Sequence, residues 1–353
     1  MKVLVGMSGG VDSSVAALIL LKQGYDVTGV TMKLRPDSMM LDDSTKGCCS
    51  FDDIDDARKV AYKLSIDHIV MNFTEEFENT VIKDFVANYQ DGKTPNPCIV
   101  CNQKIKFEAF LRRAISLNFD YIATGHYAVI KHDNQRCRWL LQKSKSSKDQ
   151  SYVLYGMRQH QLAKTLMPLS NMEKSDVRKI AFEYDLPVAN KPDSQEICFI
   201  NNNYSEFIEK YSKKQSIPGD LVDKNGTVLG KHSGIINYTI GQRKGIGVSF
   251  KKPMFVTKID AKTNKITLSG ASEQYTKTLV AKNLNFILFE SPKDQITVFA
   301  KLRYQAKPCR ATVTPFDSES VKVEFEEPQK AVTPGQSIVF YNENLVVGGG
   351  IIQ

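Results

Sequence analysis

Two cysteines one helical turn apart, Cys98 and Cys101, have the residue type and spacing that most directly suggest chemistry. They lie in TPNPCIVCNQKIKF (94–107), where Asn96 is a good N-cap and Pro97 a good first residue of a helix. A thiol in the first turn of a helix and near cations is shifted toward the thiolate, which is the nucleophilic form. The spacing therefore indicates a nucleophile, although it does not say which cysteine acts.

Other roles for this pair stay open on spacing alone. A structural zinc site takes four ligands, usually from two close pairs, but the chain has no second Cys-x-x-Cys and its five histidines are scattered. Cys48 and Cys49 would complete such a site only with unusual geometry. Both cysteines of the pair could also be small buried side chains.

A further cysteine, Cys198, lies in the polar stretch ANKPDSQEICFI (189–200). A cysteine in a protein core rarely follows so many polar residues as Asp-Ser-Gln-Glu at 193–196. The stretch therefore predicts a functional thiol, with a buried strand cysteine beside a polar turn as the alternative.

A glycine-rich loop, GMSGGVDSS (6–14), follows an apolar strand and opens a helix. Glycines let the backbone approach an anion, and the amides of the loop and helix N-terminus then face it. Its serines offer hydroxyl donors, and Asp12 could hold Mg²⁺. The loop has no Lys where a Walker A motif requires one, so the pattern predicts a nucleotide site that differs from an ordinary P-loop.

The elements that must position these residues alternate between strand and helix through about residue 200. This alternation predicts an α/β fold with a doubly wound parallel sheet. The predicted strands are 2–7, 26–34, 67–73 and 119–128, and the predicted helices are 14–24, 52–66, 75–92 and 98–118.

After residue 200 the sequence changes to short alternating apolar runs separated by Pro, Gly, Asn and Asp. FVTKIDAKTNKITLSG (255–270) predicts a hairpin, and the runs from about 278 predict a small β-barrel. GQRKGIGV (241–248) is either a tight turn with solvated cations or a phosphate clamp. We expect three domains, at 1–203, 204–275 and 276–353.

Composition narrows the functional classes. No apolar run is long enough to span a bilayer, so no membrane association is expected. Seven scattered cysteines do not resemble a disulfide framework, which favours the reducing cytoplasm. The net charge is +8, and residues 100–150 hold ten Lys or Arg against four Asp or Glu, so nucleic acid is a plausible partner.

SGGVDSS resembles the pyrophosphate (PP) loop of the N-type ATP pyrophosphatases, which have a Rossmann-like domain. More narrowly, the chain resembles the tRNA-specific 2-thiouridylase (MnmA/TrmU) family over its whole length. The matching segments occur in the family's order: GMSGGVDSS, TPNPCIVCNQKIKF, ATGHYA, KDQSYVLYGM, DSQEICFI and GQRKGIGV.

This resemblance implies a role for each matching residue. Cys101 is the implied catalytic nucleophile, and Cys198 is the implied carrier of persulfide sulfur. The implied ATP site comprises Gly6, Met7, Ser8, Gly9, Gly10, Val11, Asp12, Ser13, Met32 and Gly125. Asn96, Pro97 and Cys98 are implied to lie against the target base. The implied tRNA contacts are His126, Lys148, Asp149, Gln150, Arg303, Tyr304 and Gln336. An Asp replaces Cys98 in some members, so Cys98 is expected to be dispensable. Lys148-Asp149 could equally be part of an ordinary surface loop.

The implied reaction is thiolation of the wobble uridine (position 34) of tRNA, with ATP split to AMP and pyrophosphate. The implied cofactors are ATP and Mg²⁺, and the implied partners are tRNA and a persulfide sulfur-donor protein. Three alternatives remain: a thiolase for another tRNA base, a noncatalytic ATP-gated RNA-binding protein, and a [4Fe–4S] cluster held by Cys98, Cys101 and Cys198.

Overall fold

The computed structural model describes residues 1–36, 51–193, 197–200 and 203–353. The expectations for Cys48, Cys49 and residues 194–196 therefore lie outside the described residues. The chain divides into two compact units. Unit 1 comprises Met1–Ile82, Cys98–Asn202 and Asn344–Val346, and unit 2 comprises Lys83–Pro97, Asn203–Glu343 and Val347–Gln353.

Unit 1 is built on a parallel sheet of five strands in the order β3-β2-β1-β4-β7. The strands are β1 (Lys2–Gly6), β2 (Asp26–Lys33), β3 (Asp67–Asn72), β4 (Tyr121–Ala123) and β7 (Thr165–Leu166). β1 is central and fully buried from Val3 to Gly6, as its apolar sequence requires. This sheet confirms the predicted α/β class; the two-residue strand β7 was not predicted.

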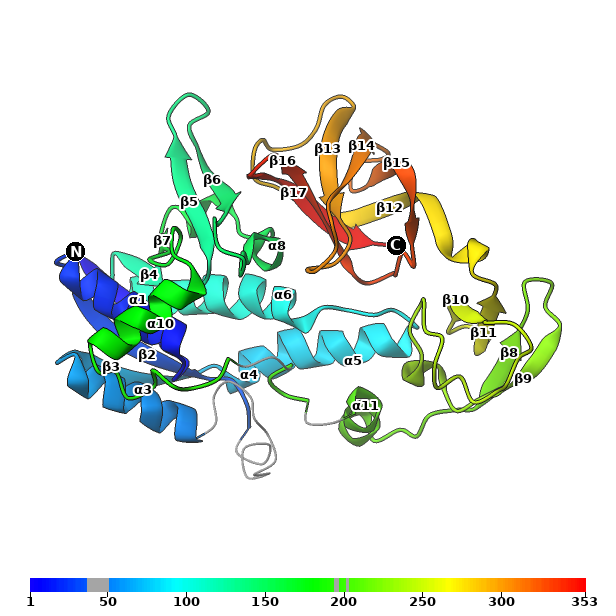
Figure 1. The fold of residues 1–353 in the computed structure, drawn as a ribbon, viewed down its shortest axis with the longest axis horizontal. Coiled ribbons are helices and arrows are strands. Elements are labelled where there is room, and N and C mark those ends of the chain that lie inside the picture. Colours follow the sequence, from blue (N-terminus) through cyan, green and yellow to red (C-terminus); the bar gives the residue numbers. More distant parts are fainter. Residues whose placement is uncertain (37–50, 194–196, 201–202) are drawn as a thin grey trace. The chain divides into compact units, whose positions relative to one another are not determined.

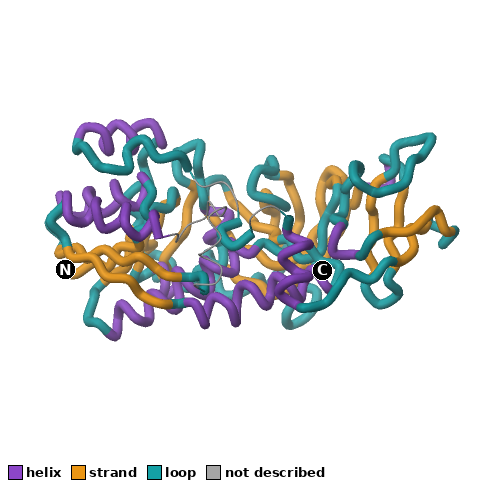
Figure 2. Tube along the Cα trace, turned by 90° about the horizontal axis from the view of Figure 1, so that it is seen from below, coloured by secondary structure: helices purple, strands orange, loops and turns teal. Residues whose placement is uncertain are grey.

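Helices cover both sides of this sheet (Figures 1 and 2). Helices of this unit include α1 (Val11–Lys22), α3 (Phe51–Lys63), α4 (Thr74–Phe77), η1 (Glu78–Ile82) and α10 (Lys174–Glu183). α1 leads to Gly24, whose φ of +82° is a conformation that glycine adopts without strain. None of the helices in the described residues is long and apolar enough to cross a membrane.

The helix that carries Cys98 and Cys101 begins at Pro97, as predicted. It runs through α6 (Pro97–Cys101), the π-helical segment η2 (Asn102–Ala109) and α7 (Phe110–Ser116). Phe107 and Leu111 of this helix are buried. The π-helical segment, which begins immediately after Cys101, is a rare geometry that is frequent at functional sites.

A hairpin that the sequence analysis missed follows the sheet strand β4. It consists of β5 (Ala128–Asp133) and β6 (Arg138–Lys143), paired antiparallel. The short helices α8 (Ser151–Leu154) and α9 (Gln159–Leu162) come next.

Unit 2 contains α5 (Lys83–Gln90), α11 (Tyr204–Ser212) and a four-stranded sheet in the order β10-β11-β8-β9. The strands are β8 (Gly219–Val222), β9 (Val228–His232), β10 (Phe255–Asp260) and β11 (Lys265–Ser269). The hairpin β10–β11 confirms the prediction for 255–270. Its core holds Leu221, Val256 and Ile266.

The rest of unit 2 is a closed antiparallel barrel (Figure 1). Its strands are β12 (Tyr275–Phe286), β13 (Ile296–Lys301), β14 (Cys309–Pro315), β15 (Val321–Lys330), β16 (Ser337–Asn342) and β17 (Leu345–Ile352). β12 closes the barrel by pairing with β17. The interior is filled by alternate residues such as Val313, Val323 and Phe340, and the predicted barrel is confirmed.

Candidate functional site

The glycine-rich loop joins β1 to α1 and is held by its own serines. Ser13 Oγ accepts a hydrogen bond from Ser8 N at 3.1 Å and donates to Gly10 O at 3.1 Å. Gly9 has a φ of +69°, and a Cβ there would lie 2.3 Å from the carbonyl oxygen of Asp53. Only glycine fits this position, so the loop has a fixed shape in which its amides can face an anion.

Two other predicted ATP-site residues lie against this loop from neighbouring strands. Gly125 follows β4, and a Cβ on it would lie 2.7 Å from Asp12 C and Ser13 N. Met32 on β2 places its methyl group 3.2 Å from where a Cβ of Gly6 would be. The carboxyl ends of β1, β2 and β4 thus bring the predicted ATP-site residues together, at the sheet edge where α/β folds bind ligands.

Asp12 lies in a polar network. Its Oδ1 accepts hydrogen bonds from Tyr127 Oη and from Lys174 Nζ, each at 2.7 Å. Burial, together with the hydrogen bond to Asp12, raises the pKa of Tyr127 well above its usual value, so the phenol stays protonated and donates.

Lys174 also contacts Asp193, the first residue of the polar stretch before Cys198. Its Nζ lies 2.7 Å from Asp193 Oδ1, and Arg178 Nη2 lies 3.1 Å from the same oxygen. Burial opposes the charge of Asp193, but the Lys174 hydrogen bond and the charges of Lys174, Arg178 and Lys148 outweigh it. The pKa of this carboxyl therefore lies below its usual value.

The three cysteines of interest belong to unit 1 and differ in exposure. Cys98 is exposed, Cys101 is 7% exposed, and Cys198 is half-buried in a turn. Asn102, next to Cys101, is buried and donates from Nδ2 to Val153 O at 3.1 Å, which fixes the start of the π-helical segment. Spacing alone does not distinguish Cys98 from Cys101, and the structure shows that the two thiols differ in exposure.

The predicted base-contacting residues Asn96 and Pro97 belong to unit 2 and follow a loop held by the barrel. Gln336 Nε2 donates to Thr94 O at 2.7 Å, and Thr94 N donates to Pro334 O at 2.9 Å. Gln336 is therefore bonded to the backbone two residues before Asn96, although Gln336 and Asn96 are far apart in sequence.

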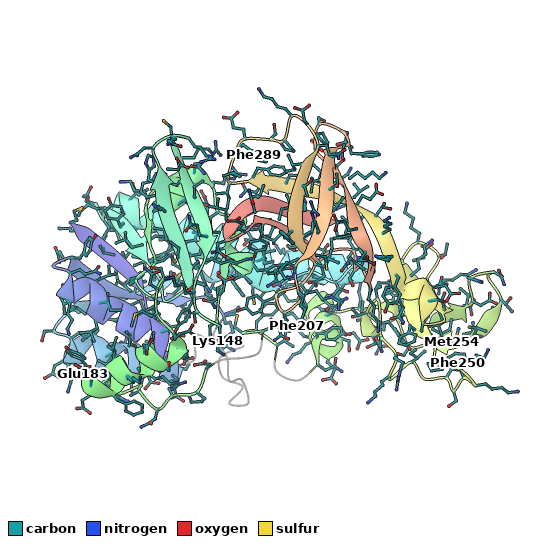
Figure 3. All side chains as sticks on the ribbon, turned by 45° about the horizontal axis from the view of Figure 1, so that its top comes forward. Lys148, Glu183, Phe207, Phe250, Met254 and Phe289 are labelled. Atoms are coloured by element: carbon teal, nitrogen blue, oxygen red, sulfur yellow. The ribbon has the colours of Figure 1, made fainter. Side chains whose placement is uncertain are left out.

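The predicted segment Lys148–Gln150 is largely engaged in local hydrogen bonds. Gln150 bonds the backbone of Tyr127 twice, through its own N–H and through Oε1. Asp149 Oδ1 accepts from Ser144 N at 2.9 Å. Lys148, labelled in Figure 3, reaches Asp193 at 3.8 Å and is about half exposed.

His126 lies beside Gly125, with its Nδ1 2.8 Å from Thr124 Oγ1 and its ring 5.6 Å from that of Phe107. Burial, and secondarily the charge of Lys106, lowers the pKa of His126 well below its usual value. The imidazole is therefore neutral at physiological pH, and it can accept or donate a hydrogen bond but adds no charge.

In unit 2, Arg303 and Tyr304 are exposed after β13. Arg303 Nη2 donates to Ala331 O, and Lys301 Nζ lies 5.8 Å above the Tyr304 ring. Unit 2 also has a groove of about 390 Å³ near the predicted GQRKGIGV segment, where Figure 3 labels two of the lining residues. The groove is lined by Arg243, Ile246, Val248, Phe250, Lys251, Lys252, Pro253 and Met254.

Comparison with known proteins identifies the family. Family models match residues 1–202 (tRNA methyl transferase HUP domain), 205–270 (tRNA methyl transferase PRC-barrel domain) and 276–352 (aminomethyltransferase beta-barrel domain). The tRNA-specific 2-thiouridylase MnmA of Acetivibrio thermocellus is 53% identical, with 100% of this chain and 99% of that protein aligned. The chain belongs to the MnmA family.

Other MnmA family members have nearly the same identity to this chain. Those of Caldicellulosiruptor saccharolyticus and Clostridioides difficile are 52% and 50% identical, each aligned over 100% of this chain and 98% of their own length. A solved 4-thiouridine synthetase–RNA complex with bound ATP shares 17% identity and a TM-score of 0.36, over 59% of this chain and 50% of that chain. The identity over full length, rather than this weak structural likeness, supports the assignment.

Sequence reasoning missed three residues that the structure places in the network around Asp12 and Asp193: Tyr127, Lys174 and Arg178. Lys174 is 162 residues from Asp12, and nothing in the local pattern of α10 predicts that contact. A weak signal was available for Tyr127, because it follows β4 at the same sheet edge as the loop. Arg35, just after β2, was also missed: it is buried, and its guanidinium has no hydrogen-bond partner among the described residues.

The next question is whether the described residues could hold a metal ion or a cluster. Within the described ranges, no three His, Cys, Asp or Glu side chains gather as metal ligands would. Cys98, Cys101 and Cys198 thus do not present the three-thiolate set that a [4Fe–4S] cluster needs, and we derive no step through one. The single carboxylate of Asp12 is enough to hold Mg²⁺ that is bound to ATP. In such sites Mg²⁺ takes one or two carboxylates, and its other ligands are phosphate and water oxygens.

Proposed function

We propose that this MnmA family member thiolates C2 of the wobble uridine (position 34) of tRNA and splits ATP to AMP and pyrophosphate. The observation that carries the proposal is that one compact unit holds both a Lys-free phosphate loop and the two cysteines expected to carry and resolve sulfur. A chain 53% identical over its full length to a tRNA-specific 2-thiouridylase supports it.

ATP is needed because a uracil 2-carbonyl oxygen is a poor leaving group. That oxygen attacks the α-phosphorus of ATP, the bond from α-phosphorus to the bridging oxygen breaks, and pyrophosphate leaves with the electron pair. The 2-oxygen is now part of AMP, which is a good leaving group. The fixed loop Gly6–Ser13 binds the phosphates through its amides, and Asp12 would hold Mg²⁺, which neutralises phosphate charge.

Sulfur transfer needs two thiols. The terminal sulfur of a Cys198 persulfide attacks C2 and AMP leaves, so a disulfide links the base to Cys198. The Cys101 thiolate then attacks the Cys198 sulfur, and the breaking S–S bond leaves its electron pair on the sulfur at C2. Alternatively, Cys101 releases sulfide from the persulfide first, and the sulfide attacks C2. Both routes end in 2-thiouridine and a Cys101–Cys198 disulfide, which a thiol reductant resets.

The exposure of the cysteines supports this division of roles. Cys101 is buried, which suits a thiol that acts only after a substrate has closed over it, whereas Cys98 is exposed. Cys198 is half-buried and can receive sulfur from a persulfide donor protein. Such thiols must stay reduced between turnovers, so we place the reaction in the cytoplasm.

The tRNA would contact residues from both units. Asn96, Pro97 and Cys98 would lie against the base, with Gln336 fixing the loop before them. The other proposed contacts are His126, Lys148, Asp149, Gln150, Arg303 and Tyr304. The groove with Arg243, Lys251 and Lys252 beside Phe250 offers phosphate contacts and a stacking face in unit 2.

Mass spectrometry of nucleosides tests the proposal. Unmodified tRNA is incubated with the protein, ATP, Mg²⁺ and a persulfide donor, under anaerobic conditions and without iron. We expect 2-thiouridine at position 34 and AMP as the nucleotide product. ADP as the product would refute the loop assignment, and thiolation of a different base would favour the alternative thiolase. Activity that tracks iron content and is lost in Cys98→Ser would favour the cluster.

A further inference from the structure

Lys174 is an ammonium at the phosphate loop that comes from elsewhere in the chain. Its side chain is 14% exposed, and Nζ lies 2.7 Å from Asp12 Oδ1. Asp12 is in the first turn of α1, two residues after Gly10 of the loop. Lys174 is the first residue of α10, so a cation is present at the loop even though the loop sequence contains none.

The charged residues around Lys174 indicate whether its ammonium can leave its carboxylate partners without leaving a charge unpaired. Asp193 is also paired with Arg178 at 3.1 Å and lies 3.8 Å from Lys148, so its charge stays compensated without Lys174. Arg178 is fixed, because its guanidinium also donates to Ala189 O and Lys191 O, each at 3.1 Å. Among the described residues, the Lys174 ammonium contacts carboxylates and no backbone carbonyl, and its flexible stem allows it to change partners.

We propose that Lys174 binds the β and γ phosphates of ATP at the Gly6–Ser13 loop and stabilises the pyrophosphate as it leaves. On ATP binding, Nζ exchanges a carboxylate oxygen for phosphate oxygens. When the bond between the α-phosphorus and the bridging oxygen breaks, the added negative charge falls on the pyrophosphate, next to the ammonium. No proton or electron transfer is required of Lys174, only charge neutralisation. The inference rests on the proposed cleavage of ATP to AMP and pyrophosphate.

The test measures pyrophosphate binding by calorimetry with the full chain and without tRNA. We expect Lys174→Met to weaken binding by about 10-fold or more, the value of a lost charge-assisted hydrogen bond. Lys174→Arg should restore most of the affinity. Lys179→Met is the matched control, because this lysine is on the same helix, its side chain is 80% exposed, and its ion pair is with Asp176, at 3.8 Å.

Asp193→Asn tests whether Lys174 binds the ligand or only forms a structural ion pair with Asp193. If Lys174 binds phosphate, Asp193→Asn should leave pyrophosphate affinity unchanged or tighter, because it frees the ammonium. The inference is overturned if Lys174→Met binds pyrophosphate like the wild type. It is also overturned if both variants lose affinity equally together with melting temperature. Lys174→Gln replaces Lys174→Met if the latter does not fold.

This readout is independent of the proposed function. A protein that binds pyrophosphate through Lys174 but adds no sulfur to tRNA would refute the thiolase proposal and leave this inference standing. Conversely, thiolation with unchanged pyrophosphate affinity in Lys174→Met would refute only the inference. In the thiolation assay, we expect Lys174→Met to lower kcat for AMP formation more than it raises KM for tRNA.

Discussion

The phosphate-loop region of unit 1 and the Arg303 region of unit 2 represent two different ways of using polar residues. Around Asp12, partners come from distant segments, since Tyr127 and Lys174 are 115 and 162 residues away. Glycines there pack against backbone so closely that no other residue fits. Around Arg303, the side chains are exposed, and the guanidinium contacts Ala331 and Thr333 on a nearby loop.

This difference indicates what each region contributes. A preorganised network of fixed geometry is suited to stabilising charge during a reaction, and its parts act as a unit. Exposed cations on a barrel are suited to phosphate contacts, which add up gradually and depend on salt. We therefore expect substitutions in unit 1 to abolish chemistry and those near Arg303 to reduce affinity by degrees.

The largest expected effect concerns the cysteines. Cys101→Ser and Cys198→Ser should each leave thiolation below about 1% of the wild-type rate, because a carrier thiol and a resolving thiol are both required. Cys98→Ser should retain most of the activity, because its thiol takes no part in the proposed cycle. Single-turnover formation of 2-thiouridine measures this. Equal losses in all three variants would contradict the account.

The next largest effect concerns Asp12. Asp12→Asn should lower the rate of AMP formation about 100-fold or more, because the carboxylate proposed to hold Mg²⁺ is lost. The fold should be retained, as checked by circular dichroism. Asp176→Asn is the matched control, an exposed acidic residue on α10. Wild-type turnover in Asp12→Asn would remove this residue from the site.

Substitution of one glycine with positive φ in each unit, Gly9 and Gly226, compares how much the free energy of unfolding depends on local packing. Gly9→Ala should lower the free energy of unfolding by about 3 kcal/mol or more, from backbone strain plus the clash with Asp53 O. Gly226 in unit 2 has a φ of +88° but open space around it, so Gly226→Ala should cost only about 1 kcal/mol. Urea denaturation measures both. Equal costs would mean that the loop relaxes around the added methyl group.

A smaller effect is expected at the barrel. Arg303→Ala should weaken tRNA binding about 10-fold and reduce the slope of log affinity against log salt by about 1, while ATP affinity stays unchanged. Arg310→Ala is the control, because this exposed barrel arginine is paired with Glu326 at 3.2 Å. Filter binding over a salt series gives both quantities; a salt-independent affinity would contradict the role of the basic residues.

The smallest effect is a pH dependence from His126. Its folded-state pKa lies below the unfolded value of about 6.5, because of burial and the charge of Lys106. As pH falls through about 6.5, the unfolded chain takes up a proton that the folded chain does not, so the free energy of unfolding decreases. His126→Asn should reduce this decrease between pH 7.5 and 5.5. An identical pH dependence in the variant would show that His126 is not the cause.

Much of the fold could be predicted from the sequence, because local patterns determine it. The strand 26–34 and the helix starting at Pro97 follow from periodicity and a helix-start signal. The two-residue strand β7 was missed because it is too short to show any period, and η2 because π-helical geometry has no distinct sequence pattern.

The site was predictable only in part. The glycine loop was recognisable because its conformation depends on residues next to one another. The contact of Lys174 with Asp12 depends on how α10 packs, and the different exposure of Cys98 and Cys101 depends on what covers each side of the helix. Such features are properties of tertiary packing, which spacing along the chain does not determine.

The central claim is that one turnover couples AMP formation to movement of sulfur from Cys198 to the base. The most direct measurement loads Cys198 with a ³⁴S persulfide and follows a single turnover with ATP and tRNA, without reductant. The account predicts ³⁴S in 2-thiouridine, an equal amount of AMP, and a peptide that joins Cys101 to Cys198. Unlabelled 2-thiouridine, or ³⁴S that stays on the protein while AMP forms, would contradict it.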